Sequence, residues 1–402
     1  MQELLRDIIQ RNKSRIFLIV LDGLGGLPIN GITELEKARI PNLNALARSS
    51  ACGLHIPVAH GITPGSGPGH LSIFGYDPIR WQIGRGILEA LGLGMEIRAT
   101  DIALRANYAT IDNDIIKDRR AQRIATDISR KLTERLQAEI KEIDGVRIIF
   151  SPGMEHRFAV VMRFPYPLKK GASDVTDTDP QQEGNPPLEP KALSPEAEEV
   201  KRIASEIVKR ASESLKDEPR ANFILLRGFS MHPDIPNFYD IYGLKALAIA
   251  NYPMYRGIAK LLSMDAPDIQ GDVSDEIEFL KGHYMDYDFV YLHIKKTDSY
   301  GEDGNFDGKV NVLEEFDEIL PEIIDLRPDV LIITGDHSTP SLLKGHSWHP
   351  VPFILNSPYV FGGLSTAFTE RECVRGELGI IPATSLMPLA LANALRLKKF
   401  GA

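Results

Sequence analysis

Three apolar runs of the sequence lead into acidic side chains. Asp22 follows IFLIVL, Asp298 lies just beyond FVYLHI, and Asp336 with His337 follows VLIITG. If these runs are parallel strands, their carboxyl ends lie at one edge of a sheet, where ligands bind. Carboxylates gathered there repel one another unless a cation neutralises them, and a set of Asp and His ligands suits divalent Mn, Zn or Mg. The pattern therefore predicts a divalent-metal site, to which His346 can add a ligand.

A single serine, Ser66, stands in a loop of glycine and proline, GITPGSGPGH, at residues 61–70. Serine is a weak nucleophile until its proton is removed or its oxygen approaches a metal. Glycines let the backbone come close to an anion, and a helix that begins here presents its N-terminus to that anion. Taken singly, such a serine or aspartate more often caps a helix or forms a turn. The combination instead favours a nucleophile beside two metals for phosphoryl or sulfuryl transfer.

The elements that must position these residues alternate between strands and helices. Continuous apolar strands are predicted at 16–21, 222–228, 244–250, 288–294, 329–334 and 351–356. A short helix with Pro41 in its first turn follows the first strand, and the glycine loop opens another. This alternation predicts an α/β fold with a mostly parallel sheet flanked by helices.

The middle of the chain has a different pattern, which predicts an inserted, smaller α+β domain over residues 96–235. An amphipathic helix is expected over 121–143, with Ile124, Ile128 and Leu132 on its apolar face. Residues 165–195 are rich in Pro, Asp, Gly and Gln, and a long loop of this kind is often functional. The core domain is then formed by residues 1–95 and 236–402.

Composition narrows the function classes. The chain has 402 residues, 43 % of them hydrophobic and 25 % charged, and a formal net charge of −9. This composition is that of a globular protein, and the negative charge argues against nucleic acid as a partner. The 2 cysteines form no CxxC pattern, and no apolar run is long enough for a signal or a membrane span. We therefore expect a cytoplasmic protein with no membrane partner, whose oligomeric state the sequence leaves open.

Five segments together resemble the archaeal-type cofactor-independent phosphoglycerate mutases of the alkaline phosphatase superfamily: VLDGLGG, GITPGSGPGHLSIFGYDP, KKTDSYGEDGNF, TGDHSTP and GHSWHPVPFI. DRRAQRI, SDVTDTDP and YGLKALAIA extend the resemblance over nearly the whole chain. It implies a phosphatase-like core with two divalent metals, Mn foremost and Mg, Co or Zn as alternatives, and an inserted substrate-binding or lid domain. It also implies interconversion of 3-phosphoglycerate and 2-phosphoglycerate in glycolysis and gluconeogenesis. The reaction would pass through a phosphoserine and need no bisphosphoglycerate.

The resemblance assigns roles by motif, with Ser66 as the nucleophile. The family's metal ligands correspond to Asp22, Asp336 and His337 for the metal that activates the serine, and to Asp298 and His346 for the other metal. His346 is preferred over His349 because it stands four residues before Pro350, as the family's histidine stands before its proline.

One position departs from the family pattern, which has a histidine where this chain has Glu302 in TDSYGEDG. A carboxylate can also ligate Mn or Mg, so Glu302 is kept as a candidate ligand with a harder metal preference. Its negative charge would also repel a phosphate. Two alternatives stay open: another metal-dependent phosphatase or phosphopentomutase of the superfamily and, because of Glu302, a catalytically weakened relative that binds a metabolite.

A phosphoglycerate substrate carries several negative charges, so cations must face it. Arginine binds phosphate and carboxylate groups through two parallel hydrogen bonds. The candidate substrate-binding residues are Asp118, Arg119, Arg120, Arg123, Arg157, Arg227 and Lys296, with Lys295 beside the last. For each cation taken alone, a solvated surface charge is an equally good interpretation.

Overall fold

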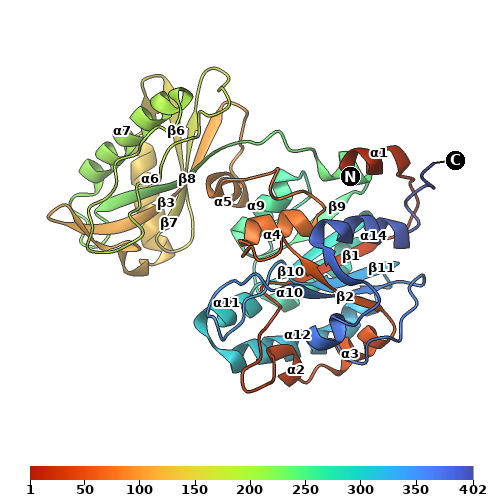
Figure 1. Ribbon diagram of the computed structural model, residues 1–402. Coiled ribbons are helices and arrows are strands. Elements are labelled where there is room, and N and C mark those ends of the chain that lie inside the picture. The colour runs from red at the N-terminus through yellow and green to blue at the C-terminus, as the bar shows by residue number, and fades with distance from the viewer. Residues whose placement is uncertain (402) are drawn as a thin grey trace. The chain divides into compact units, whose positions relative to one another are not determined.

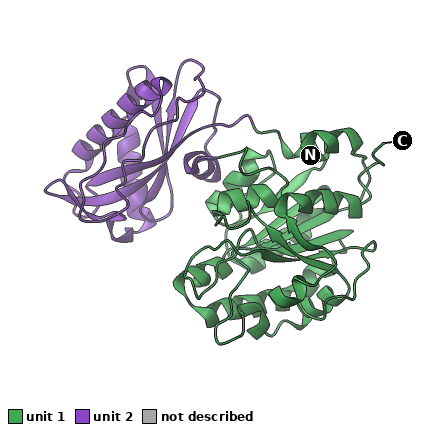
Figure 2. Ribbon diagram, in the orientation of Figure 1, with its two compact units in different colours: residues 1–82, 235–402 green, residues 83–234 purple. Residues whose placement is uncertain are grey.

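The computed structural model describes residues 1–401, and the chain divides into two compact units (Figure 1, Figure 2). Unit 1 comprises Met1–Gln82 and Ile235–Ala402, and unit 2 comprises Ile83–Asp234. Unit 2 thus includes helix α5 (Arg85–Gly92), which the sequence analysis had assigned to the core domain. Helix α5 packs closely on strand β3 (Asp101–Asp112) of the same unit, because a Cβ on Gly86 would lie 2.2 Å from the carbonyl oxygen of Ala103.

Unit 1 is built on a seven-stranded sheet whose central strands are entirely buried. In spatial order its strands are β13 (Gly379–Pro382), β2 (Ala51–Ile56), β12 (Val351–Asn356), β11 (Val330–Thr334), β1 (Ile16–Leu21), β10 (Phe289–Ile294) and β9 (Ala246–Ile249). Only β12 runs antiparallel to its neighbours. Continuous apolar runs are typical of such strands, because helices cover both faces of the sheet. The predicted fold class is confirmed.

Helices lie on both faces of this sheet, with α2, α3 and α12 on one face and α4, α9 and α14 on the other (Figure 1). The helices of unit 1 are α1 (Gln2–Ile8), α2 (Glu34–Lys37), α3 (Pro41–Arg48), α4 (Ser66–Ile73), α8 (Phe238–Tyr242), α9 (Pro253–Leu261), α10 (Val273–His283), α11 (Lys296–Asp303), α12 (Phe306–Ile324), α13 (Glu370–Cys373) and α14 (Leu386–Asn393). Within residues 1–401, no helix is both long and apolar enough to cross a membrane.

Unit 2 has its own antiparallel sheet and its own apolar core. The strands are β3 (Asp101–Asp112), β4 (Ile115–Asp118), β5 (Glu142–Ile143), β6 (Val146–Pro152), β7 (Arg157–Arg163) and β8 (Phe223–Met231). The order is β4-β3-β7-β6-β5, and β8 also pairs with β3. Helices α6 (Thr126–Glu139) and α7 (Glu198–Leu215) pack against the sheet.

The start of α6 differs from the sequence-based expectation. The helix begins at Thr126 rather than at residue 121, because Ala121–Arg123 form a separate turn with φ between 47° and 54°. Ile128 is 44 % exposed, whereas Ile124 and Leu132 are buried as predicted. Three consecutive left-handed residues other than glycine are costly, at about 1–2 kcal/mol each. Side-chain contacts, rather than local preference, must therefore hold this turn.

Candidate active site

The three central strands β11, β1 and β10 deliver the predicted carboxylates to one edge of the sheet. Leu21 is in register with Ile294, and Val20 with Thr334, so the strands end side by side. Asp22 and Asp336 then lie just past β1 and β11, and Asp298 lies in the first turn of α11, which follows β10. The structure therefore brings together the acidic residues that the strand pattern indicated.

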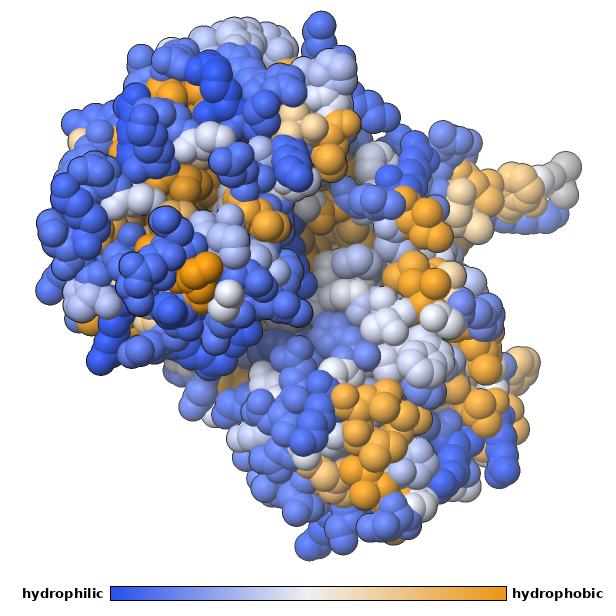
Figure 3. Space-filling view, turned by 60° about the vertical axis from the view of Figure 1, so that its left-hand side comes forward, coloured by the Kyte–Doolittle hydropathy of each residue, from blue (hydrophilic) through white to orange (hydrophobic). Residues whose placement is uncertain are grey.

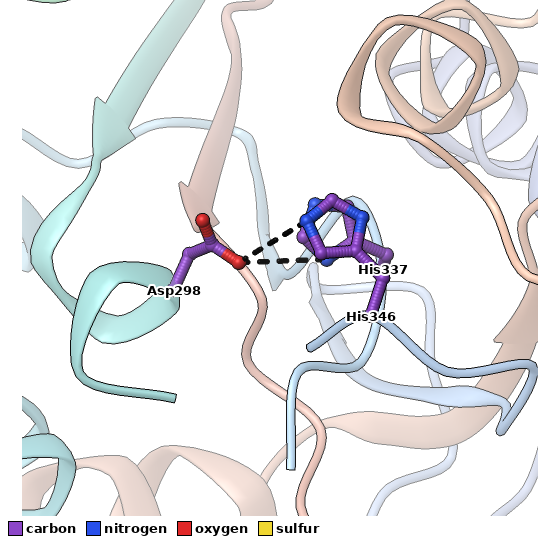
Figure 4. A group of neighbouring side chains, drawn as sticks. All are labelled: Asp298, His337 and His346. Carbon is purple, nitrogen blue, oxygen red and sulfur yellow. Dashed lines mark ion pairs between the residues drawn. The ribbon is translucent and has the colours of Figure 1, made fainter. Parts of the chain in front are cut away.

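Two groups of side chains have ligand atoms within 4.8 Å of one another, and they share His337. In the first group, His337 Nε2 lies 3.4 Å from Asp22 Oδ1 and 3.2 Å from Asp336 Oδ2. In the second group, Asp298 Oδ1 lies 3.5 Å from His346 Nε2 and 4.0 Å from His337 Nδ1 (Figure 4). The two imidazole rings stack with their centroids 3.7 Å apart.

Ser66 is the first residue of α4, and its hydroxyl faces the first group. Its Oγ lies 3.3 Å from His337 Nε2. One turn later, His70 Nδ1 lies 2.8 Å from the Ser66 carbonyl oxygen and 3.1 Å from Asp336 Oδ2. Gly69 lets the helix approach, because a Cβ there would lie 2.4 Å from the Asp336 carbonyl oxygen. The glycine loop therefore docks the serine against the end of β11.

Buried donors surround Asp22 and hold it in its charged form. Tyr255 Oη donates a hydrogen bond to Asp22 Oδ2, and Lys295 Nζ lies 3.0 Å from the same oxygen. Burial by itself would raise the pKa of Asp22, but His293 and Lys295 hold that pKa well below its ordinary value. Burial and the charge of Asp22 raise the pKa of Asp336 to about 8. The neighbouring groups therefore do not supply enough positive charge to neutralise both Asp22 and Asp336.

The chemistry of these residues fits a divalent cation. Asp22 Oδ1 and Asp336 Oδ2 are buried and have no hydrogen-bond partner among residues 1–401. Buried carboxylate oxygens are ordinarily hydrogen-bonded or bound to a metal. Burial also lowers the pKa of His337, which keeps its ring neutral, as a metal ligand must be. Carboxylate oxygens with imidazole nitrogens form a donor set for Mn, Zn or a similar ion.

Glu302 lies at the rim of the second group rather than within it. Its side chain is 55 % exposed, and its Oε1 lies 3.7 Å from His346 Nε2. Neither ligand group includes it. His349 also lies outside both groups, with its Nδ1 3.1 Å from Ser347 Oγ.

The lysine that reaches the carboxylates is Lys295. Its Nζ contacts both Asp22 and Asp298, whereas Lys296 is exposed and helps line a separate cavity beside Val312 and Glu315. The sequence placed both lysines before Asp298, but it did not show which of them faces the sheet edge. The first helical residue after β10 is Lys296, so the two side chains diverge at the strand-to-helix transition.

Lys309 is a further charged residue that the sequence analysis did not single out. It is fully buried in α12, and its Nζ donates to the carbonyl oxygens of Gly23 at 2.8 Å, Gly25 at 3.1 Å and Thr339 at 2.9 Å. These hydrogen bonds fix the segments that follow β1 and β11. A signal was present, because Lys309 shares the apolar face of its helix with Leu313 and other buried residues at helical spacing.

The remaining predicted site residues lie in unit 2. Asp118, Arg119, Arg120 and Arg123 line a cavity of about 370 Å³ together with Gln122 and Glu183. The two carboxylate oxygens of Asp118 accept the backbone N–H groups of Arg120 at 2.7 Å and Gln122 at 3.0 Å. Asp118 therefore stabilises the left-handed turn that carries these arginines.

A positive field extends beyond this cavity. Burial, followed by the charges of Arg157 and other arginines, lowers the pKa of His156 to about 3. Arg227 belongs to a further group, in which it and Arg119 both contact Asp179. The predicted arginines thus gather on one domain, where they can bind anionic oxygens.

Comparison with known proteins gives consistent matches over the whole chain. A family model described as 2,3-bisphosphoglycerate-independent phosphoglycerate mutase matches residues 47–221. The chain is 59 % identical to an Aquifex aeolicus protein named "Probable 2,3-bisphosphoglycerate-independent phosphoglycerate mutase", with 100 % of both chains covered. A solved structure from Pyrococcus horikoshii has a TM-score of 0.83 at 30 % identity, covering 98 % of this chain and 100 % of that one. The cofactor-independent phosphoglycerate mutase from Thermoplasma acidophilum has a TM-score of 0.69 at 29 % identity, with 95 % and 100 % covered.

Proposed function

We propose, from the premise that this chain belongs to the 2,3-bisphosphoglycerate-independent phosphoglycerate mutase family, that it interconverts 3-phosphoglycerate and 2-phosphoglycerate through a phosphoserine at Ser66. As a member of that family the protein is an isomerase. The proposed reaction is a step of glycolysis and gluconeogenesis. The observation that carries the proposal is the Ser66 hydroxyl, 3.3 Å from the histidine that both candidate ligand groups share.

Ser66 would receive and return the phosphoryl group. In the first half of the reaction, Ser66 Oγ loses its proton and forms a bond to phosphorus while the bond to the 3-oxygen of the substrate breaks, and the 3-oxygen takes up a proton. The glycerate then turns. In the second half, the 2-hydroxyl loses its proton and its oxygen takes the phosphoryl group back, while Ser66 Oγ takes up a proton. The N-terminus of α4 favours the negative charge of the phosphoryl group throughout, because its first N–H groups have no partner within the helix.

The proposed ligands are Asp22, Asp336 and His337 for a divalent cation beside Ser66, and Asp298, His337 and His346 for a second. Mn is the expected ion, with Mg, Co or Zn as alternatives, and Glu302 at the rim is a further candidate ligand. Divalent cations held by these residues would lower the pKa of the serine hydroxyl and neutralise charge on phosphoryl oxygens. His70 orients the helix that carries Ser66 through its contact with Asp336.

The proposed substrate-binding residues lie mainly in unit 2. We assign Arg119, Arg120, Arg123, Arg157 and Arg227 to the phosphate and carboxylate groups of the substrate. This assignment is supported by the cavity that the first three of them line. In unit 1, Lys295 is favoured over Lys296 for a role near the reacting groups, because Lys295 contacts Asp22 and Asp298. Asp118 acts through the turn it stabilises.

The test is conversion of 3-phosphoglycerate by EDTA-treated protein, with and without added Mn, in the absence of bisphosphoglycerate. We expect metal-dependent formation of 2-phosphoglycerate that Ser66→Ala abolishes. Ser72→Ala, a buried serine in the same helix, is the matched control and retains activity. Release of free phosphate without isomer would instead favour a phosphatase. No reaction with Mn, Mg, Co or Zn would contradict the proposal.

A further inference from the structure

A buried acidic side chain joins two of the arginines of unit 2. Asp179 lies in the long segment between β7 and α7, and its side chain is 0 % exposed. Its Oδ1 accepts Arg119 Nε at 2.7 Å, and its Oδ2 accepts Arg119 Nη2 at 2.7 Å. The same Oδ2 lies 3.2 Å from Arg227 Nη1. One buried carboxylate therefore contacts two guanidinium groups from separate elements.

Two neighbours of Asp179 contact the same arginines. Gln181 Oε1 accepts Arg119 Nη2 at 3.3 Å and Arg227 Nη2 at 3.4 Å. Asp177 Oδ2 lies 3.5 Å from Arg227 Nε, and its Oδ1 accepts the backbone N–H of Gly228 at 2.8 Å. We call Asp177, Asp179 and Gln181 the acidic brace.

The brace is itself fixed to the sheet of unit 2. The backbone N–H of Thr178 donates to the Leu226 carbonyl oxygen at 2.9 Å, and Leu226 N–H donates back to Thr178 Oγ1 at 2.8 Å. The segment that carries the brace is thus tied to β8, the strand that carries Arg227. Arginine side chains lose conformational freedom when they are held in this way, so less entropy remains to be lost on binding a ligand.

The arginines keep part of their surface open to solvent. The side chains of Arg119 and Arg227 are 18 % and 23 % exposed, respectively. Arg119 binds the brace through Nε and Nη2, and its Nη1 has no hydrogen-bond partner among residues 1–401. A guanidinium held along one edge can donate from its other edge to a phosphate or carboxylate oxygen.

We propose that Asp179 is a positioning residue, which holds Arg119 and Arg227 ready for an anionic group of the phosphoglycerate substrate. This inference rests on the proposed function. Asp179 itself does not touch the substrate, because its oxygens face the two arginines. It acts by setting the orientation of their donors before the substrate binds.

The test is the affinity of the full-length, Mn-loaded protein for 3-phosphoglycerate, measured by calorimetry beside KM and kcat. We expect Asp179→Asn to weaken binding about tenfold or more and to raise KM more than it lowers kcat, because a charge-assisted fork is lost. In an Arg119→Ala background, the loss of affinity caused by Asp179→Asn should be at least threefold smaller, since the two side chains act as a unit. Asp144→Asn, which alters an exposed pair with Arg202, is the matched control and leaves affinity unchanged.

The same fold loss of affinity on Asp179→Asn in the wild type and in Arg119→Ala would overturn the inference, because a purely structural carboxylate acts independently of Arg119. If Asp179→Asn does not fold, Gln181→Ala decides. We expect it to weaken binding severalfold, whereas Gln182→Ala, whose side chain is hydrogen-bonded only to Asn185 among residues 1–401, has no effect. Equal affinities of these two variants would overturn the inference in that case.

The same experiment separates this inference from the proposed reaction. A wild-type protein that binds 3-phosphoglycerate but does not isomerise it contradicts the proposed reaction, while the affinity losses of the variants still test the role of Asp179. An active wild type in which Asp179→Asn causes the same affinity loss with and without Arg119 contradicts the role of Asp179 alone. A wild type that does not bind 3-phosphoglycerate contradicts both.

Discussion

Replacing Lys295 by methionine should destabilise the metal-free protein far more than the metal-loaded one. Lys295 Nζ lies 3.0 Å from Asp22 Oδ2 and also contacts Asp298. Burial by itself would lower the pKa of Lys295, but the charges of these two aspartates raise it above its ordinary value. Among residues 1–401, Lys295 is therefore the lysine that pairs directly with these carboxylates when no metal is bound.

The size of the effect follows from burial. Removing one partner of a buried ion pair costs about 3–5 kcal/mol, because it leaves a buried charge unpaired. The Lys295 side chain is 30 % exposed, so we discount the loss to about 3 kcal/mol. A divalent cation at the same carboxylates supplies the missing positive charge, and with Mn the loss should fall to about 1 kcal/mol or less.

The measurement is the free energy of unfolding in urea, in EDTA and in saturating Mn, for wild type and Lys295→Met. Lys296→Met is the matched control, because Lys296 is the adjacent exposed lysine and forms no ion pair among residues 1–401. Its stability should equal that of the wild type in both conditions. An equal loss for Lys295→Met with and without Mn would refute the reasoning, because the lysine would then act through packing alone.

Two further predictions concern acidic side chains. Glu302→His should lower KM for 3-phosphoglycerate by roughly threefold, because it removes a negative charge that is 55 % exposed beside His346. Glu302→Gln removes the same charge and should lower KM equally. A raised KM for Glu302→His would contradict the prediction. Burial raises the pKa of Glu276 from 4.5 to about 7. Between these two pH values the folded protein keeps a proton that the unfolded chain releases, so the free energy of unfolding falls by about 3 kcal/mol as the pH rises from 4.5 to about 7. Glu276→Gln should abolish this fall and be more stable than wild type at pH 8. The free energy of unfolding in urea is measured from pH 5 to pH 8, and the same pH dependence for wild type and variant would contradict the raised pKa of Glu276.

The sequence predicted the edge of the sheet well, and the reason is geometric. Asp22 and Asp336 directly follow apolar strands, and parallel strands bring whatever follows them to a common edge. The backbone alone therefore determines where these side chains lie. The role of Ser66 was predicted from its glycine loop and from the family resemblance, and its distance to His337 supports that role.

Other features depend on contacts between distant segments, which no local pattern encodes. The left-handed turn at Ala121–Arg123 is stabilised by Asp118, so a helical period alone placed the start of α6 too early. The choice between Lys295 and Lys296 depends on where α11 begins. Strand β12 has the same apolar pattern as its parallel neighbours but runs antiparallel to both. Strand direction depends on the connections, not on the side chains of the strand itself.

The insertion of unit 2 has a consequence for synthesis of the protein. Within the described residues 1–401, strand β1 pairs only with β10 and β11, and β2 pairs only with β12 and β13. Neither N-terminal strand therefore has a sheet partner in that range before residue 289. The strands of unit 2 lie within Asp101–Met231 and can pair as soon as that segment has left the ribosome. Domains fold as units during translation, and long-range parallel pairing is slow. The nascent chain therefore carries two apolar strands without sheet partners while its second unit folds.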